Sequence, residues 1–256
     1  MASQWVAFQT ILFREIRRFM RIWPQTLLPP VITISLYFLI FGSVIGSRIG
    51  TMGGFDYMTF VVPGLVMMAV INSSFTNVAF SFFSTKFQKS IEELLVSPVA
   101  SWVILAGYVM GGTVRGLITG AIVMALSLFF VEFKIHNVLI MMMAVFMTAL
   151  LFALAGFING VFAKKFDDVS IIPTFVLTPL TYLGGVFYSV DILPTLWREL
   201  SFLNPILYQV NAFRYGIIGE ASGINVTMAF LVMAFAIVAL AAYSIHLLKT
   251  GKGLRT

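Results

Sequence analysis

The chain consists of long apolar runs separated by short charged breaks. The runs at 118–131, 138–162 and 228–248 contain almost no ionisable residue. A helix that crosses the bilayer core needs about 20 consecutive apolar residues, and this pattern occurs six times in the sequence. Only 10% of the residues are charged and 60% are hydrophobic, whereas soluble domains carry about 25% charged residues. The pattern predicts an all-α, polytopic membrane protein with one transmembrane domain over residues 1–256.

The charged breaks set the limits of six expected transmembrane helices. These spans are expected at about 29–45, 58–83, 102–131, 138–162, 169–187 and 226–248. Pro29 and Pro30 are expected to open the first span, because the first amides of a helix have no intrahelical partner and proline is tolerated there. The charged, amphipathic start of the chain does not resemble a cleavable signal peptide, so none is expected.

Residues 3–23 are expected to form an interfacial helix in the plane of the lipid headgroups. Apolar residues recur at spacings of three or four and form one face: Trp5, Phe8, Leu12, Ile16, Phe19 and Trp23. The other side is basic and carries Arg14, Arg17, Arg18 and Arg21. Such a helix, apolar on one face and cationic on the other, is typical of a segment that lies on the membrane surface.

The lysines and arginines are distributed unequally between the two sides of the expected bundle. Eleven of the sixteen lie in the N-terminal helix, at 86–89, at 164–165 or in the C-terminal tail. Arg115 lies within a span, and the opposite side holds only Arg48, Lys134, Arg198 and Arg214. Because positive charge marks cytoplasmic loops, both termini are expected in the cytoplasm. The net charge of +6 is then explained by topology, and no nucleic-acid partner is expected.

The expected spans lack the residues that several classes of membrane protein need. They contain no Asp or Glu at mid-depth, no potassium-filter sequence and no arginine-rich voltage sensor. Ion-coupled carriers usually place acids in the membrane, although some sodium sites use carbonyls and hydroxyls. An ion-coupled secondary transporter or channel therefore remains the alternative to an ATP-driven permease. The chain also has no P-loop, so ATP would have to be hydrolysed by another subunit.

No metal site or catalytic set is expected in this chain. It contains no cysteine, and its two histidines, His136 and His246, are far apart in the sequence. Neither a transition-metal site nor a thiol nucleophile can be built from these residues. A membrane enzyme is disfavoured because no catalytic set is present, and a receptor because no soluble sensing domain is present. No cofactor is expected to bind the chain itself.

Arg115, in the segment GGTVRG, is the one charge well inside an expected span. A mid-membrane arginine costs about 3 kcal/mol on insertion scales and therefore faces protein or water. Arg115 either reaches the interface or pairs with a helix end or loop acid, or it lines a substrate path or an inter-subunit contact. Glycines at four- or five-residue steps would let a neighbouring helix approach closely: Gly107, Gly111, Gly112, Gly116 and Gly120.

The segment 179–219, PLTYLGGVFYSVDILPTLWRELSFLNPILYQVNAFRYGIIG, resembles the signature of ABC-2-type permeases, the membrane subunits of bacterial ABC exporters. The resemblance is carried, in order, by Gly184–Gly185, Leu193–Pro194, Asn204–Pro205 and Arg214. It extends over the whole chain, including the amphipathic N-terminal helix, the six-span layout and the segments KSIEELLVSP and GGTVRG. Within the family, the chain is most similar to the nodulation-factor and drug-export branch.

The resemblance implies a homodimer in the bacterial inner membrane, joined to two copies of a separate ATPase that binds ATP and magnesium. Residues 86–98 would be the coupling helix that sits on this ATPase; an ordinary amphipathic loop helix is the alternative. Phe87, Ile91 and Leu94 are expected on one face of it. The polar side chains are expected to be free to meet the partner: Lys86, Lys89, Glu92 and Glu93.

Residues 188–225 are too polar to cross the membrane and too apolar to extend freely into water, and a re-entrant hairpin is expected at 188–219. Two short helices that dip back into the outer leaflet, with turns at Pro194 and Pro205, would satisfy both requirements. This re-entrant hairpin would cap the exit of a path that works by alternating access. Candidates for the pathway or the dimer interface are Arg115, Gly184, Gly185, Asn204, Pro205 and Arg214. The 26 Phe and 14 Met suit amphipathic or lipid-linked cargo.

Overall fold

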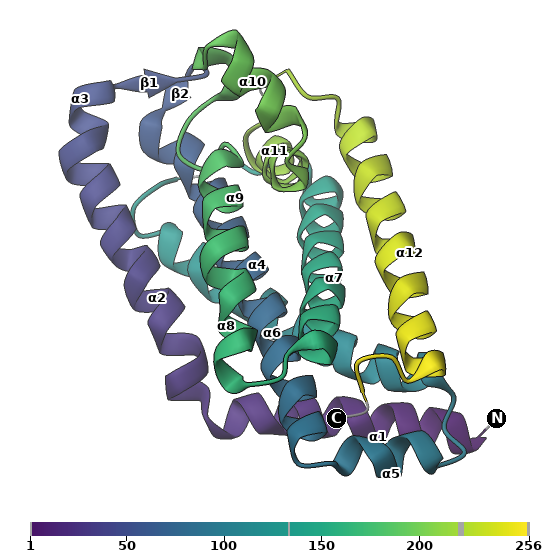
Figure 1. The fold of residues 1–256 in the computed structure, drawn as a ribbon. Coiled ribbons are helices and arrows are strands. Elements are labelled where there is room, and N and C mark those ends of the chain that lie inside the picture. The colour runs from purple at the N-terminus through teal and green to yellow at the C-terminus, as the bar shows by residue number, and fades with distance from the viewer. Residues whose placement is uncertain (1, 133, 220–222, 255–256) are drawn as a thin grey trace.

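The computed structural model describes residues 2–132, 134–219 and 223–254. Long helices stand side by side, with α1 and α5 lying across one end of the bundle and α10 at the other (Figure 1). In chain order the elements are α1 Ala2–Arg21, α2 Trp23–Leu39, η1 Ile40–Gly46, α3 Ser47–Ile49, β1 Thr51–Met52, β2 Phe55–Asp56, α4 Tyr57–Phe87, α5 Ser90–Val96, α6 Ser101–Ser127, α7 Val138–Phe162, α8 Phe166–Ile172, η2 Pro173–Leu177, α9 Thr178–Leu183, η3 Val190–Ile192, α10 Thr195–Phe202, α11 Pro205–Ile218 and α12 Val226–Thr250. β1 and β2 form a two-residue antiparallel pair.

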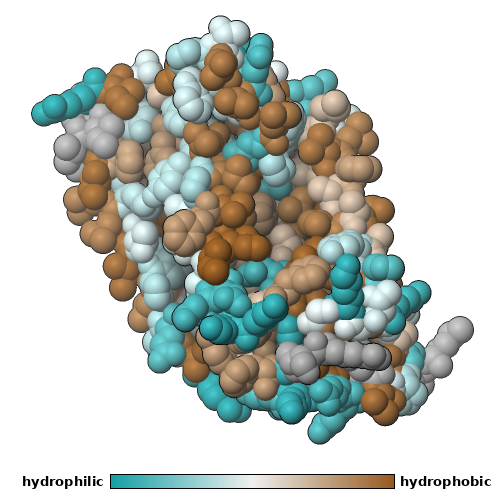
Figure 2. Space-filling view, in the orientation of Figure 1, coloured by the Kyte–Doolittle hydropathy of each residue, from teal (hydrophilic) through white to brown (hydrophobic). Residues whose placement is uncertain are grey.

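The prediction of a helical membrane protein is confirmed. Among the described residues, five helices are long and apolar enough to cross a membrane: Trp23–Gly42, Tyr57–Phe87, Ser101–Ser127, Val138–Phe162 and Val226–Thr250. Figure 2 shows apolar side chains over the flanks along α2 and α12, whereas many hydrophilic ones gather at the end formed by α1 and α5. This distribution suits a bundle whose sides face lipid and whose ends face water.

The segment expected as the fifth span, 169–187, is a broken helix. It consists of α8, the π-turn η2 and α9, and it ends at Leu183. Pro173 and Pro179 lie at the starts of η2 and α9. A proline has no amide to donate to the carbonyl four residues earlier, so it favours such a change in helical pitch.

The prediction that Pro29 and Pro30 open the first span is wrong. α2 begins at Trp23, directly after α1, and both prolines lie inside it. Pro24 occupies the first turn, where the missing amide costs little. The helix therefore starts at Trp23 instead of Pro29, and the interior prolines cannot donate to the carbonyls of Gln25 and Thr26 four residues earlier.

α4 is the central helix of the bundle and is buried along most of its length. It packs against α6, α7 and α11. The close fit depends on glycines of α6: a Cβ on Gly120 would lie 2.6 Å from Val70 Cγ2 of α4, and one on Gly111 would lie 2.6 Å from Glu15 Cβ of α1. The predicted glycine stripe thus serves two neighbours. Gly107 and Gly111 face α1, whereas the later members face α4: Gly112, Gly116 and Gly120.

Candidate functional site

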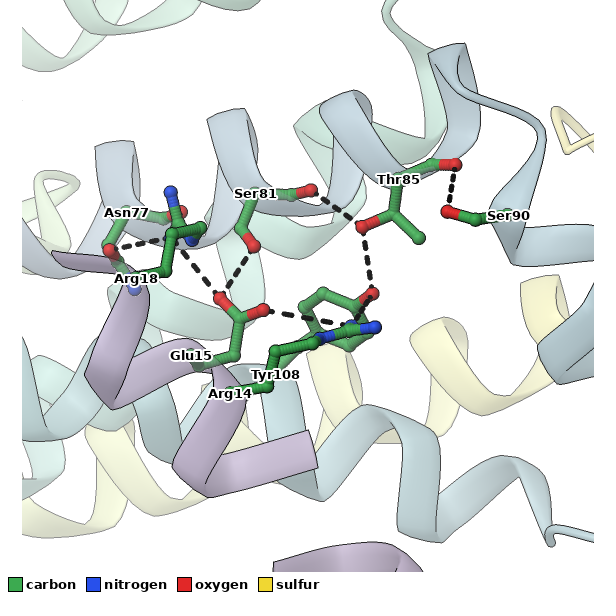
Figure 3. Close-up of polar contacts among 8 residues, drawn as sticks. All are labelled: Arg14, Glu15, Arg18, Asn77, Ser81, Thr85, Ser90 and Tyr108. Carbon is green, nitrogen blue, oxygen red and sulfur yellow. Dashed lines mark hydrogen bonds and ion pairs between the residues drawn. The ribbon is translucent and has the colours of Figure 1, made fainter. Parts of the chain in front are cut away.

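A buried carboxylate on α1 forms the centre of a polar cluster at the end of the bundle (Figure 3). Glu15 is only 1% exposed and accepts hydrogen bonds from Ser81 Oγ at 2.5 Å and from Arg18 Nη2 at 3.2 Å. Arg14 Nη2 lies 3.8 Å from the other carboxylate oxygen. A buried carboxylate is tolerated only when it is paired and hydrogen-bonded, so these contacts hold α1 against α4.

A chain of hydroxyl contacts extends this cluster to α5 and α6. Arg14 Nη2 donates to the Tyr108 hydroxyl at 2.6 Å, and that hydroxyl donates to Thr85 Oγ1 at 2.9 Å. Ser90 Oγ, in the first turn of α5, donates to the Thr85 carbonyl at 3.1 Å. We call the eight residues of Figure 3 the α1 polar cluster: Arg14, Glu15, Arg18, Asn77, Ser81, Thr85, Ser90 and Tyr108. It connects α1, α4, α5 and α6 in one network.

Arg115 joins the edge of this cluster to the first turn of α2. Its Nη1 and Arg18 Nη2 both donate to Asn77 Oδ1, at 3.3 and 2.9 Å. Its Nη2 donates to the Thr26 carbonyl at 3.1 Å. The residue four positions after Thr26 is Pro30, which has no amide hydrogen, so the helix itself cannot supply the usual donor. The sequence left several roles open for Arg115. The structure shows one of them, pairing with the end of a helix, at the Thr26 carbonyl.

Lys86 belongs to α4, not to a separate coupling helix. Its side chain is buried, and Nζ donates to the carbonyls of Val161 at 2.6 Å and Ala163 at 2.8 Å. These carbonyls lie at the C-terminal end of α7, where the last carbonyls of a helix lack intrahelical donors and attract cations. The prediction that Lys86 is free to meet a partner is therefore wrong.

The remainder of the expected coupling segment forms the short helix α5, which follows Lys89 in a left-handed conformation with φ of 59°. Ile91 is 1% exposed, whereas Glu92 and Glu93 are exposed. Leu94 is half-buried and packs on the same apolar cluster as Ile91. α5 is thus anchored by its apolar residues and presents its carboxylates outward.

Phe87 does not share the buried face of Ile91 and Leu94 as predicted. It is the last residue of α4 and is 61% exposed. Its ring lies 5.1 Å from that of Phe166, which begins α8. The break between α4 and α5 at Gln88–Lys89 rotates the two helices relative to each other, so a single helical face does not run through residues 86–98.

The segment 188–219, which contains α10 and α11, lies at the opposite end of the bundle from α1 and α5 (Figure 1). Asn204 caps α11 by accepting from the Ile206 amide at 3.0 Å, and its Nδ2 donates to the Leu180 carbonyl at 2.6 Å. Pro205 follows in the first turn. Gly184 packs against Ile206, where an added Cβ would lie 2.7 Å from Cγ2. The motif therefore fixes α11 to the end of α9.

Arg214 is completely buried between α4, α11 and the turn after α9. Its Nε donates to the Phe60 carbonyl at 3.1 Å, and its guanidinium lies 3.9 Å from the centre of the Phe60 ring. Nη1 donates to Asn211 Oδ1 at 3.0 Å and Nη2 to the Gly185 carbonyl at 2.7 Å. Gly185 has φ of +70°, a conformation that favours glycine. Arg214 and Gly185 of the signature are thus joined inside the chain, whereas Pro194 and Pro205 are exposed.

Glu15, Asn77, Ser81 and Tyr108 were not among the residues predicted from the sequence. One local signal marks Glu15: it is the only acid in α1, with arginines one position before it and three positions after it. The other residues are ordinary polar members of apolar helices. Their importance becomes visible only when α1 is placed beside α4 and α6.

Comparisons with known proteins agree with this architecture. The family model described as ABC-2 type transporter matches residues 6–218. The inner membrane transport permease YadH of Escherichia coli (strain K12) is 57% identical over 252 residues, which cover 98% of each chain. Nodulation protein J of Sinorhizobium fredii (strain NBRC 101917 / NGR234) is 25% identical over 207 residues, 78% of each chain. The protein therefore belongs to the ABC-2 type transporter family and is a membrane permease subunit of an ABC transporter.

Proposed function

We propose that two copies of this chain form the membrane pathway of an ATP-driven exporter, each copy bound to one copy of a separate ATPase subunit. ATP and magnesium would be bound by that partner, and this chain would have no catalytic role of its own. Family membership supports an ABC ATPase as partner. The observation that carries the rest of the proposal is the α1 polar cluster, because it joins α5, which presents free carboxylates, to the long helices α4 and α6.

The contacts of α5 suggest how the partner would act on the pathway. Closure of the ATPases on ATP would displace α5, and the Ser90–Thr85 and Tyr108–Thr85 hydrogen bonds would carry this movement to α4 and α6. α1 would move with them through Glu15. The helices would tilt at the dimer interface and open a path outward beneath the hairpin formed by 188–219. This is alternating access driven from one end of the bundle.

An ion-coupled carrier is the second class to consider, and the position of the acids argues against it. Among the described residues, the buried carboxylate is Glu15, on the helix that crosses the end of the bundle rather than in a span. Carriers of this class usually bind the coupling ion at mid-depth. The geometry therefore favours a permease energised by a partner.

We place the permease in a bacterial inner membrane with six spans and with both termini in the cytoplasm. The broken helix from α8 to α9 would be the fifth span, and α10 with α11 would form the re-entrant external hairpin. Support comes from the end of the bundle where α1 and α5 lie (Figure 1). Ten of the sixteen basic residues belong to α1, the α4–α5 junction, the segment before α8 and the end of α12: Arg14, Arg17, Arg18, Arg21, Lys86, Lys89, Lys164, Lys165, Lys249 and Lys252. Positive charge is typical of the cytoplasmic side.

This topology predicts which engineered cysteines an impermeant maleimide can reach. Thr51→Cys and Thr195→Cys are expected to react in cells whose outer membrane has been permeabilised. Glu92→Cys and Lys252→Cys are expected to react only after the inner membrane is opened. All four positions are exposed, and the chain has no native cysteine, so labelling reports one site at a time. Labelling of Glu92→Cys from outside would contradict the orientation.

Reversing the charge on α5 is expected to release the ATPase. In the double variant Glu92→Lys/Glu93→Lys, like charges would meet at the contact, which can cost several kcal/mol. We expect loss of co-purification and of stimulated ATP hydrolysis, with unchanged insertion in the membrane. The matched control is Glu132→Lys/Glu199→Lys, which makes the same charge change at exposed positions elsewhere. Normal assembly of the α5 variant would show that α5 is not the coupling helix.

The proposed cargo is amphipathic or lipid-linked. The spans are rich in phenylalanine and methionine, whose adaptable apolar surfaces suit such molecules. The direct measurement is ATP hydrolysis by the reconstituted complex in the presence of lipids, lipid-linked sugars and amphipathic drugs. Stimulation by one class and not by the others would identify the substrate class, and no stimulation by any of them would contradict this assignment.

A further inference from the structure

An open cavity of about 840 Å³ lies between α1 and the C-terminal end of α4, beside the first residue of α5. Four of its lining side chains are the arginines of α1: Arg14, Arg17, Arg18 and Arg21. The opposite wall carries the neutral polar residues Ser84 and Gln88 of α4 and its capping position. The cavity is therefore large enough for a small ligand group and strongly cationic on one side.

The carboxylate that lines this cavity is already paired with groups of the protein itself. Glu15 is its one acidic lining residue, and it is held by Ser81 and Arg18 with Arg14 nearby. Among the residues that the structure describes, Arg17 and Arg21 have no hydrogen bond or ion pair, and both are exposed. In addition, the buried Nε of Arg18 has no partner. The cavity thus offers several guanidinium donors, and its lining carboxylate is already paired.

This donor set matches the chemistry of a phosphate group. Guanidinium groups bind phosphate oxygens through paired, charge-assisted hydrogen bonds. Two of the arginines are held before any ligand arrives, because Arg14 is bonded to Tyr108 and Arg18 to Asn77. A site that is ordered in advance loses less entropy on binding. The fixed pair and the free pair, Arg17 and Arg21, could close on one phosphate from two sides.

The apolar border of the cavity indicates that the phosphate belongs to an amphipathic molecule. Phe13 and Ile22 line the same cavity and are 56% and 40% exposed. Trp5 of α1 and Trp23 at the start of α2 are also exposed, and tryptophan is enriched where membrane meets water. We infer that the cavity is a specific binding site for the phosphate headgroup of an anionic membrane lipid. The inference rests on the membrane orientation proposed above, which places α1 at the anionic cytoplasmic surface, and it does not depend on transport.

Native mass spectrometry of the full-length chain in neutral detergent tests this inference. The probes are phosphatidylglycerol and phosphatidylcholine, with inorganic phosphate and glycerol 3-phosphate as soluble competitors. The informative variant is Arg17→Gln/Arg21→Gln, because neither side chain has a structural partner to lose. The control is Lys249→Gln/Lys252→Gln, which removes the same charge from exposed positions at the end of α12, outside the cavity.

We expect the parent and the Lys249/Lys252 control to bind phosphatidylglycerol in preference to phosphatidylcholine. The Arg17/Arg21 variant is expected to bind it about tenfold more weakly, since it loses two charge-assisted contacts. Equal weakening in both variants would mean diffuse attraction by net charge and would overturn the site. Equally strong competition by inorganic phosphate would replace the lipid with a soluble phosphate compound. Unchanged lipid binding combined with loss of the ATPase in the Arg17/Arg21 variant would assign the cavity to the protein partner instead.

Discussion

Replacement of Arg214 by leucine is expected to lower the thermal unfolding temperature of the purified protein by roughly 10 °C. The substitution removes the donors that serve the carbonyls of Phe60 and Gly185 and the side chain of Asn211. These acceptors are enclosed in the chain with Arg214 and would lose their partner without access to water. A loss of about 3 kcal/mol follows from the usual cost of such groups.

The unfolding temperature can be read from the loss of the monodisperse peak in gel filtration after heating. The control is Arg198→Leu in the preceding helix of the same segment, where the ion pair to Asp191 at 3.2 Å joins two half-exposed side chains. Such a pair contributes about 1 kcal/mol or less, so this variant should remain close to the parent. Lysine at position 214 should also be defective, because one ammonium cannot reproduce the planar fork of donors. A leucine variant as stable as the parent would disprove the structural role of Arg214.

Replacement of Glu15 by alanine is expected to loosen α1 from the bundle without preventing membrane insertion. The change leaves Arg14 and Arg18 with no acid between them and removes the acceptor of Ser81. Hydrogen bonds to a charged group contribute about 2 kcal/mol, which corresponds to a roughly 30-fold larger population with α1 undocked. The four arginines of α1 make this population measurable, since trypsin cleaves after arginine.

The rate at which trypsin removes an N-terminal tag should therefore rise in the Glu15→Ala variant. Glu92→Ala serves as the control, because it also removes a carboxylate from the α1 and α5 end, but from an exposed position. If the proposed function is correct, the same Glu15 variant should assemble with the ATPase yet show weakened stimulation of ATP hydrolysis by cargo. Unchanged cleavage would mean that apolar contacts, such as Phe19, hold α1 without help from the carboxylate.

The limits of the apolar helices could be predicted where a local signal accompanies the pattern. α7 was predicted at 138–162 and is observed there, because Asn137 caps its first turn by accepting from the Ile140 amide at 3.1 Å. The predicted end of the second span at residue 83 was too early, because α4 continues to Phe87. The sequence there becomes polar, but Lys86 extends α4 by reaching the carbonyls at the end of α7. That stabilisation is tertiary and has no local signature.

The candidate site was predicted less completely than the fold. Arg214 and Gly185 were recognised as signature residues, but the burial of Arg214 depends also on α4, whose Phe60 lies 154 positions away in the sequence. The α1 polar cluster combines residues of α1, α4, α5 and α6 whose spacing carries no motif. Prediction of this cluster would require the sides of α1 that face protein, lipid and water to be distinguished from one another. Periodicity alone separates only an apolar side from a polar one.

The glycines of α6 have a consequence for movement. Because Gly111 and Gly120 let α1 and α4 approach to contact distance, these helices are locked to α6 and can shift only as one rigid body, since packed interiors do not deform continuously. Flexibility must then be found elsewhere. The two π-helical stretches, η1 after α2 and η2 between α8 and α9, interrupt the regular hydrogen bonding of outer helices, as hinges do. The inner helices α1, α4 and α6 should therefore move as one unit, and bending along the membrane path should be concentrated at η1 and η2 in the outer helices.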